Sequence, residues 1–116
     1  MDKDVLKSRT KQFALRAIKL AEALPKNKTG SVIASQLIRS STSVGANYRS
    51  ACRGRSRAEF IAKLGIALEE VDESAYWFEL VIEGNLMKKE QVEPLLIEAN
   101  ELTAIFLSSI KTARNR

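Results

Sequence analysis

At 116 residues, the chain is long enough for one domain to close a single hydrophobic core. It contains no histidine and one cysteine, Cys52, which excludes an intramolecular disulfide and any histidine-based catalytic or metal site. The formal net charge is +5, and the two halves differ in sign: residues 1–63 carry fourteen basic and four acidic side chains, whereas residues 64–116 carry five and ten.

The first two predicted elements are amphipathic helices, because apolar residues recur at spacings of three and four. The first is expected from about Asp4 to about Leu24, after which LPKNKTG supplies a proline and a glycine for a turn. The second is expected to begin after Gly30. Its predicted core seam consists of Leu37, Ser41, Val44, Tyr48 and Ala51. Helical geometry directs three arginines away from that seam, namely Arg39, Arg49 and Arg53.

The stretch NYRSACRGRSRAEF, residues 47–60, places four arginines around one bend. Gly54 is expected to end the second helix, because glycine tolerates the left-handed conformation that is common at helix ends. Ser56 and Glu59 match a capping box, in which the serine side chain bonds the Glu59 amide and the glutamate reaches back to the Ser56 amide. A third helix should therefore start directly after a tight bend.

Two further helices complete the prediction. The third should end at Gly84 and Asn85, with a core face of Phe60, Leu64, Leu68, Val71, Ala75, Phe78 and Ile82. The fourth should bury Val92, Leu95, Ala99, Leu102, Phe106 and Ile110. Pro94 lacks an amide donor, so we expect residues 88–93 to form a separate first turn or a kink. Four helices with short loops predict one all-α domain over residues 1–116, an antiparallel up-and-down four-helix bundle.

Two motifs resemble those of a known family. QLIRSSTSVGANY matches a Gln-Leu-x-Arg-x-x-x-Ser-x-x-x-Asn core, and RSRAEFIAKL matches an arginine-rich bend followed by an aromatic-aliphatic helix start. Together they resemble the four helix bundle family that includes the proteins encoded in intervening sequences of bacterial large-subunit ribosomal RNA, over nearly the whole chain. Where many members have Glu-Gly after the asparagine-containing run, this chain has RSACRG, which changes the charge there.

The resemblance implies that copies of the chain assemble, since relatives form cyclic pentamers. A distant branch of similar fold is the accessory protein of diversity-generating retroelements, where it works with a reverse transcriptase and RNA. The implied partners are therefore other copies of this chain in a homopentamer, RNA, and a reverse transcriptase or another protein. Being encoded within a ribosomal RNA gene is not in itself a reason to bind that RNA.

The candidate nucleic-acid-binding set is basic: Arg39, Arg49, Arg53, Arg55, Arg57 and Lys63. Arginine presents a planar fork of donors that suits phosphate. One nearby aromatic and the lack of a glycine-rich phosphate loop favour contact with the nucleic-acid backbone over base recognition. The alternative is a solvated bend that keeps the protein soluble or contacts an acidic neighbour. Both interpretations remain open at this point.

The third helix also carries a set of acidic residues: Glu69, Glu70, Asp72, Glu73, Glu79 and Glu83. The Glu-x-x-His motifs of dimetal bundles cannot exist here, so we expect a solvated or partner-facing acidic side and no metal or cofactor. The serines of residues 40–43 have no base to activate them, so no catalytic residue is expected. Asn47 should make a structural hydrogen bond.

Tyr76 and Trp77 are the candidate oligomer interface. The helical wheel places Phe78 in the core, Tyr76 nearly opposite it, and Trp77 on a flank near Ile66. A large aromatic side chain outside a monomer core often marks an interface. The alternative is that Trp77 widens the core stripe.

These features favour a non-enzymatic bundle that forms a ring and presents a basic surface to nucleic acid, in particular RNA. The alternative is a protein-binding scaffold or assembly factor whose basic bend meets the acidic third helix of the next copy, with no RNA role. The N-terminal stretch has no signal-peptide core, and no apolar run approaches the roughly 20 residues of a membrane span. With Cys52 as a small core residue, we expect a soluble bacterial protein of the reducing cytoplasm, without a membrane partner.

Overall fold

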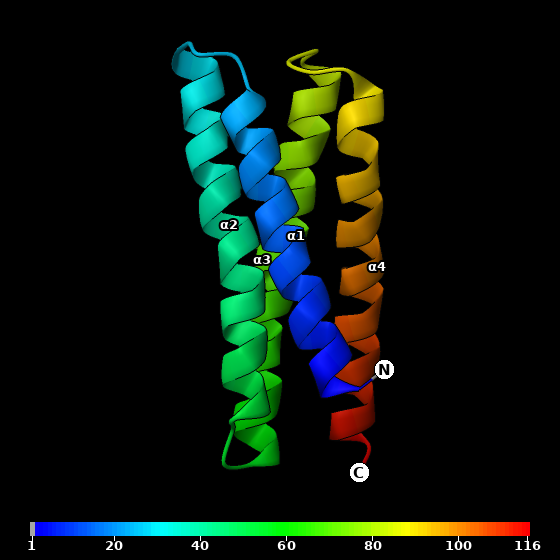
Figure 1. Ribbon diagram of the computed structural model, residues 1–116. Helices are drawn as coiled ribbons and strands as arrows, with labels where there is room; N and C mark the ends of the chain where they lie inside the picture. Colours follow the sequence, from blue (N-terminus) through cyan, green and yellow to red (C-terminus); the bar gives the residue numbers. More distant parts are fainter. Residues whose placement is uncertain (1) are drawn as a thin grey trace.

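The computed structural model describes residues 2–116, which form four helices joined by short loops (Figure 1). The helices are α1 Lys3–Ala23, α2 Lys28–Cys52, α3 Arg57–Glu83 and α4 Lys89–Arg114. Successive helices run in opposite directions, which confirms the predicted all-α up-and-down bundle. The α2–α3 bend and both ends of the chain lie at the same end of the bundle (Figure 1). Within the described residues, no helix has the length and hydropathy of a membrane span.

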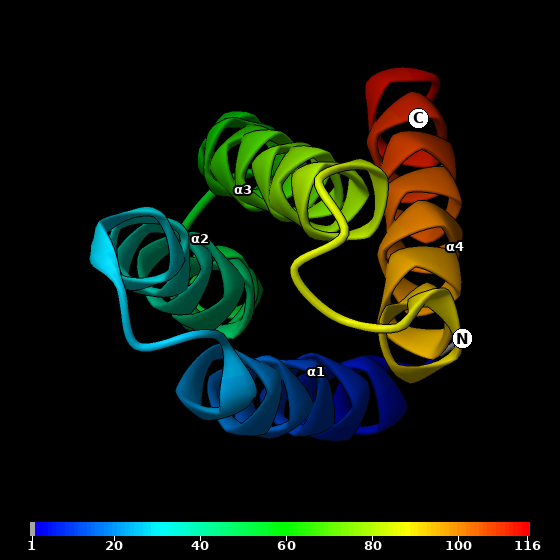
Figure 2. The same ribbon diagram turned by 90° about the horizontal axis from the view of Figure 1, so that it is seen from above.

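The helices do not pack evenly around the bundle. α2 packs closely along α3, as do α3 along α4 and α1 along α2, whereas α1 meets α4 over a much shorter stretch. Figure 2 shows α1 and α4 tilted in different directions, so that they pack together over only part of their length. Arg9 joins them there: its Nε donates to Glu98 at 2.9 Å and its Nη2 donates to Glu101 at 3.2 Å.

The core is one continuous apolar cluster to which all four helices contribute. Every core position that the sequence predicts for α2 and α4 is buried. Aromatic rings meet at two levels. The rings of Phe13 and Phe78 lie edge to face with centroids 6.1 Å apart, and those of Tyr48 and Phe106 stack at 5.7 Å.

The predicted core face of α3 is wrong in part. Leu64, Val71, Ala75 and Phe78 are buried as expected, but three other predicted positions, Phe60, Leu68 and Ile82, are only half-buried. The interior instead includes Ala67, Ser74 and Val81. α3 packs against both α2 and α4, so it buries a wider stripe than one row of apolar residues indicates.

Ser74 shows why a polar residue fits inside this stripe. Its hydroxyl donates to the Glu70 carbonyl oxygen at 2.9 Å, and the hydroxyl of Ser40 in α2 lies 2.9 Å away. A buried polar group is tolerated when it has a hydrogen-bond partner. The small serine side chains also allow α2 and α3 to approach each other.

Side-chain caps set the helix starts. The Asn27 side chain accepts a hydrogen bond from the Gly30 amide at 2.8 Å, so α2 begins at Lys28 and Gly30 belongs to its first turn rather than to the preceding loop. Ser56 Oγ accepts from the Glu59 amide at 3.1 Å, which confirms that half of the predicted capping box. Asn caps and Ser caps satisfy amide donors that have no partner within the helix.

α2 ends beside Gly54 as expected, but neither the left-handed conformation expected at this glycine nor the separate first turn expected before Pro94 is found. Gly54 does not adopt a left-handed conformation; Asn85 does, with φ 56°. The bend requires glycine for space, since a Cβ atom on Gly54 would lie 3.0 Å from the Ala51 carbonyl oxygen and 3.2 Å from the Phe60 amide nitrogen. Pro94 does not set off a separate first turn, because α4 runs unbroken through it with the proline exposed.

The buried rings should dominate stability. Replacing Phe106, which is fully buried, with alanine should lower the free energy of unfolding by about 3–5 kcal/mol, because the transfer and cavity costs add. The adjacent Leu107 is 53 % exposed, so Leu107→Ala should change the free energy of unfolding by less than about 0.5 kcal/mol. Urea unfolding followed by circular dichroism measures both. Equal losses would contradict the core described above.

Candidate nucleic-acid interface

The structure does not gather the six predicted basic residues into one patch. Arg39 lies near the middle of α2, ten residues and about 15 Å along the helix from Arg49. Its Nη1 donates to Glu70 Oε2 at 3.0 Å, and its Nη2 donates to Glu73. The hydrogen bond from Arg39 lowers the pKa of Glu73 below its ordinary value. Arg39 therefore joins α2 to α3 and already has anionic partners.

Three further residues of the predicted set, Arg55, Arg57 and Lys63, have different surroundings. Arg57, the first residue of α3, donates from Nη1 to the main-chain oxygens of Ala113, at 3.4 Å, and Arg116. It thereby joins the start of α3 to the end of α4. Arg55 is exposed at the bend, and Lys63 is half-buried on α3.

Arg49 and Arg53 face α1, where they form a basic groove with lysines that the sequence pattern did not single out. One hollow between α1 and α2 is lined by Lys7, Ser8, Lys11, Arg49 and Arg53. We call this hollow the basic groove. Its four cations are Lys7, Lys11, Arg49 and Arg53. Two of the six predicted residues thus meet two new ones across a helix seam.

An adjoining hollow extends the basic groove along the same seam. It shares Lys7, Lys11 and Arg49, and its other lining residues are small: Thr10, Ala14, Thr42, Gly45 and Ala46. A Cβ atom on Gly45 would lie only 3.2 Å from Thr10 Oγ1, so this glycine lets the two helices approach closely. The floor of the extended groove is consequently free of bulky side chains.

The electrostatics of the basic groove are one-sided. Within residues 2–116, none of its four cations lies within ion-pair distance of a carboxylate. Lys7 and Lys11 are four residues apart on α1, as are Arg49 and Arg53 on α2. Like charges at this spacing destabilise a helix by about 0.2–0.5 kcal/mol per pair. A bound polyanion would remove that repulsion.

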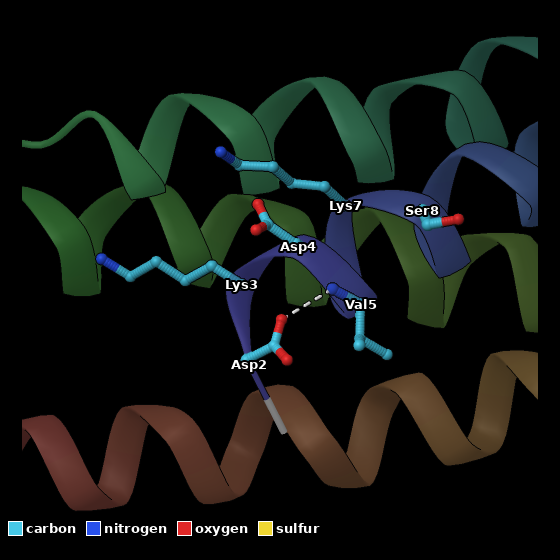
Figure 3. A pocket seen from close by; sticks show the side chains of 6 residues that line it. All are labelled: Asp2, Lys3, Asp4, Val5, Lys7 and Ser8. Atoms are coloured by element: carbon cyan, nitrogen blue, oxygen red, sulfur yellow. Dashed lines mark hydrogen bonds between the residues drawn. The ribbon is translucent and has the colours of Figure 1, made fainter.

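Carboxylates do occur at the first turn of α1, beside the groove (Figure 3). Asp2 caps the helix, accepting a hydrogen bond from the Val5 amide at 3.0 Å. Asp4 lies between Lys3 and Lys7 in this view but is not within ion-pair distance of any described cation. The two lysine side chains extend in the same direction. Neither acid therefore forms an ion pair with a groove cation in the described residues.

The acidic residues lie mainly on the opposite hairpin. Residues 1–56 carry twelve basic and three acidic side chains, whereas residues 57–116 carry seven and eleven. The α1–α2 hairpin is thus the basic side of the bundle, and the α3–α4 hairpin is the acidic side. Among the described residues, no three Cys, Asp or Glu side chains are arranged to hold a metal ion. Asn47 donates to the Ser43 carbonyl at 2.9 Å, as the sequence predicted.

Tyr76 and Trp77 occupy the outer side of α3. Tyr76 is 54 % exposed, and its ring lies 5.4 Å from that of Trp77, edge to face. Trp77 is half-buried against the core, and its indole Nε1–H acts on the Glu73 carboxylate, whose pKa it helps to lower, without a hydrogen bond of ordinary geometry. The exposed Tyr76 is consistent with an oligomer interface, whereas the half-buried Trp77 is consistent with a wider core stripe. The oligomer interface remains a prediction.

Sequence reasoning missed Lys7 and Lys11 because each helix was considered alone. A wheel places side chains around one axis but does not say which neighbouring helix they face. A signal was present in the spacing: Lys3, Lys7 and Lys11 form a row at four-residue intervals, and no acidic residue follows Asp4 until Glu22. Only the pairing of α1 with α2 puts that row opposite Arg49 and Arg53.

Comparison with known proteins agrees with this architecture. The sequence matches the 23S rRNA-intervening sequence protein family over residues 3–108. The chain belongs to this family. It is similar to the crystal structure of a protein of unknown function from the S23 ribosomal protein family of Bacteroides thetaiotaomicron, with 39 % identity and a TM-score of 0.87. That match covers 96 % of this chain and 99 % of the other. No protein of curated function matches the sequence.

In this member of the intervening sequence protein family, Arg39 should act on Glu73 rather than on a ligand. Arg39→Gln should raise the pKa of Glu73 toward its ordinary value, because the hydrogen bond from Arg39 is the main cause of the lowering. A depressed carboxyl pKa stabilises the fold above the unfolded-state pKa and loses that contribution as pH falls through the folded-state pKa. The stability difference between parent and variant should therefore shrink in acid. Carboxyl NMR titration checks the pKa, and an unchanged value would contradict the pairing.

Proposed function

We propose that this protein is a non-enzymatic, cytoplasmic bundle that binds RNA through the phosphate backbone, using the basic groove and the adjacent bend. The observation that supports the proposal is the set of four groove cations without a carboxylate partner in the described structure. Arg55, two residues after Arg53 in the sequence, is exposed at the bend and adds a further cation to the proposed site. Arg39 is not part of the proposed site, because its guanidinium already forms ion pairs with Glu70 and Glu73.

The groove geometry favours a strand backbone over base recognition. Cations four residues apart are separated by about 6 Å along each helix, so the two rows can contact successive phosphates from both sides. No aromatic side chain lines either hollow of the groove. Stacking platforms and base-edge contacts are therefore lacking, and binding should depend on salt rather than on base sequence.

Removing the groove charges should weaken RNA binding. Changing Lys7, Lys11, Arg49 and Arg53 to glutamine should lower affinity for a single-stranded RNA at low salt. It should also reduce the slope of log affinity against log salt by about 0.7 for each phosphate that the variant no longer neutralises. The side chains are at the surface or half-buried, so helix content should not change. Fluorescence anisotropy over a salt series measures both quantities.

A matched control distinguishes the effect of removing the groove cations from the effect of lowering the total positive charge. The four-residue variant at Arg16, Lys19, Lys28 and Lys88, also to glutamine, removes the same charge outside the groove. It should retain most of the parent affinity and slope, as should Arg39→Gln. Equal losses in both four-residue variants would point to diffuse attraction, and no binding by the parent at low salt would refute the RNA proposal.

We also propose that copies of the chain assemble into a ring, a homopentamer by resemblance to the family. The supporting observations are the exposed Tyr76 and the basic and acidic hairpins on opposite sides. A head-to-tail contact between those hairpins would close a ring if the rotation between copies allows it. If assembly occurs without RNA binding, the scaffold function, with a protein such as a reverse transcriptase as partner, becomes the better proposal.

Assembly has a direct test. Light scattering at micromolar concentration should give a mass several times 12.9 kDa, with five copies expected. Tyr76→Ala should lower that mass with little change in helix content, because buried aromatics usually dominate interface energetics. Leu107→Ala, which removes an equally exposed apolar side chain from α4, is the control. A monomer across the whole concentration range would rule out this assembly.

A further inference from the structure

A second cavity opens at the end of the bundle that holds the bend and both chain ends. α1 has 21 residues and the other helices have 25 to 27, so α1 stops short of this end (Figure 1). The result is a cavity of about 690 Å³ to which all four helices contribute. It is separate from the basic groove, whose lining residues do not recur in its wall.

The cavity wall is cationic and rich in hydroxyl groups. Three of the residues that line the cavity are basic, namely Lys3, Arg57 and Arg116. No lining residue has an acidic side chain. Ser56, Ser108, Ser109 and Thr112 add hydroxyl groups from the bend and from α4. Leu6 and Phe60 supply apolar wall. Outside the lining, the Asp2 carboxylate, which caps α1, acts electrostatically on Tyr48.

Two of the polar groups are held in place by the fold. Arg57 is fixed at the wall by its Nη1 contacts with the Ala113 and Arg116 carbonyl oxygens, and guanidinium has donors on its other two nitrogens. Tyr48 is only 3 % exposed and its ring stacks on Phe106, which orients the hydroxyl. Burial, with a contribution from the neighbouring Cys52, raises the pKa of the Tyr48 phenol. Its hydroxyl is a donor at neutral pH, as in an ordinary tyrosine.

We propose that this end cavity binds the phosphomonoester of a nucleotide, either the terminal phosphate of an RNA strand or a free nucleoside monophosphate. A phosphomonoester carries about −1.5 to −2 charge at neutral pH and three acceptor oxygens, which suit three cations and several hydroxyl donors. The volume lies in the range of about 300–1,000 Å³ that is typical of small-molecule sites. The apolar wall offers contact for the nucleoside.

The shape distinguishes the cavity from the basic groove. The groove runs along one helix seam, so the middle of a strand can lie in it. The cavity opens at one end of the bundle and is lined by residues of all four helices, so we expect it to take the end of a strand or a free nucleotide. The strand-end form of the inference rests on the proposed RNA function, whereas the free-nucleotide form does not.

The experiment has two arms. In the first, the chain is titrated with adenosine monophosphate and with adenosine while amide NMR signals are recorded. The monophosphate should shift the signals of Arg57, Ser109 and Thr112 and bind about tenfold more tightly than the nucleoside, because charged hydrogen bonds account for the difference. In the second, one short RNA strand is compared with a 5′-phosphate and with a 5′-hydroxyl, and the phosphorylated strand should bind about tenfold more tightly.

Matched variants locate the effect. Lys3→Gln combined with Arg116→Gln should abolish the preference for phosphate in whichever arm shows it. Tyr48→Phe should reduce that preference while keeping the ring stacked on Phe106. Lys28→Gln with Lys88→Gln, at the opposite end of the bundle, removes equal charge and should leave the preference intact.

The outcomes are distinct. A phosphate preference in both arms supports a strand end as ligand, and a preference confined to the mononucleotide supports a free nucleotide. Equal binding with and without phosphate in both arms overturns the inference, as does a preference that survives the Lys3 and Arg116 changes. Failure of the RNA proposal would appear instead as absent binding of the 5′-hydroxyl strand at low salt, and the mononucleotide arm does not depend on it.

Discussion

Two aromatic contacts across the diagonals of the bundle set the orientation of every helix. Phe13 on α1 meets Phe78 on α3, and Tyr48 on α2 meets Phe106 on α4, although the backbones of these diagonal pairs stay apart. A ring that must face across the core fixes how its helix is rotated. Aromatic pairs of this kind add about 0.5–1.5 kcal/mol to the burial of their area. The placement of the surface charges follows from these rotations.

The position of each arginine illustrates this dependence. Tyr48 faces the core, so Arg49 turns toward α1 and Arg53, one helical turn later, lies beside it. Arg39 is on the same helix but faces α3, where carboxylates neutralise it. The same residue type therefore serves as an interhelical link at one position and as an unneutralised charge at another. The difference comes from the neighbouring residues, which are carboxylates around Arg39 and lysines around Arg49 and Arg53.

The helices and their order could be predicted from the sequence, whereas the candidate site could be predicted only in part. Apolar periodicity and the Ser56 cap are local signals, so they locate the α2–α3 bend correctly. The space required around Gly54 depends on where Phe60 lies after the chain has turned, which local pattern does not report. The basic groove depends on two helices packing side by side, and the end cavity depends on four. The more helices a feature depends on, the less of it can be predicted from the sequence of any one helix.

The short α1–α4 seam has a consequence for how the chain folds. The other three seams join helices that follow one another in sequence, so they form with small loop-closure entropy. The α1–α4 seam is different, because Arg9 and Glu98 are separated by 89 residues. A topology dominated by contacts between sequence neighbours has low contact order and folds rapidly. We expect the three seams between sequence neighbours to form early, with α1 already paired with α2, and the α1–α4 seam to close last and open first.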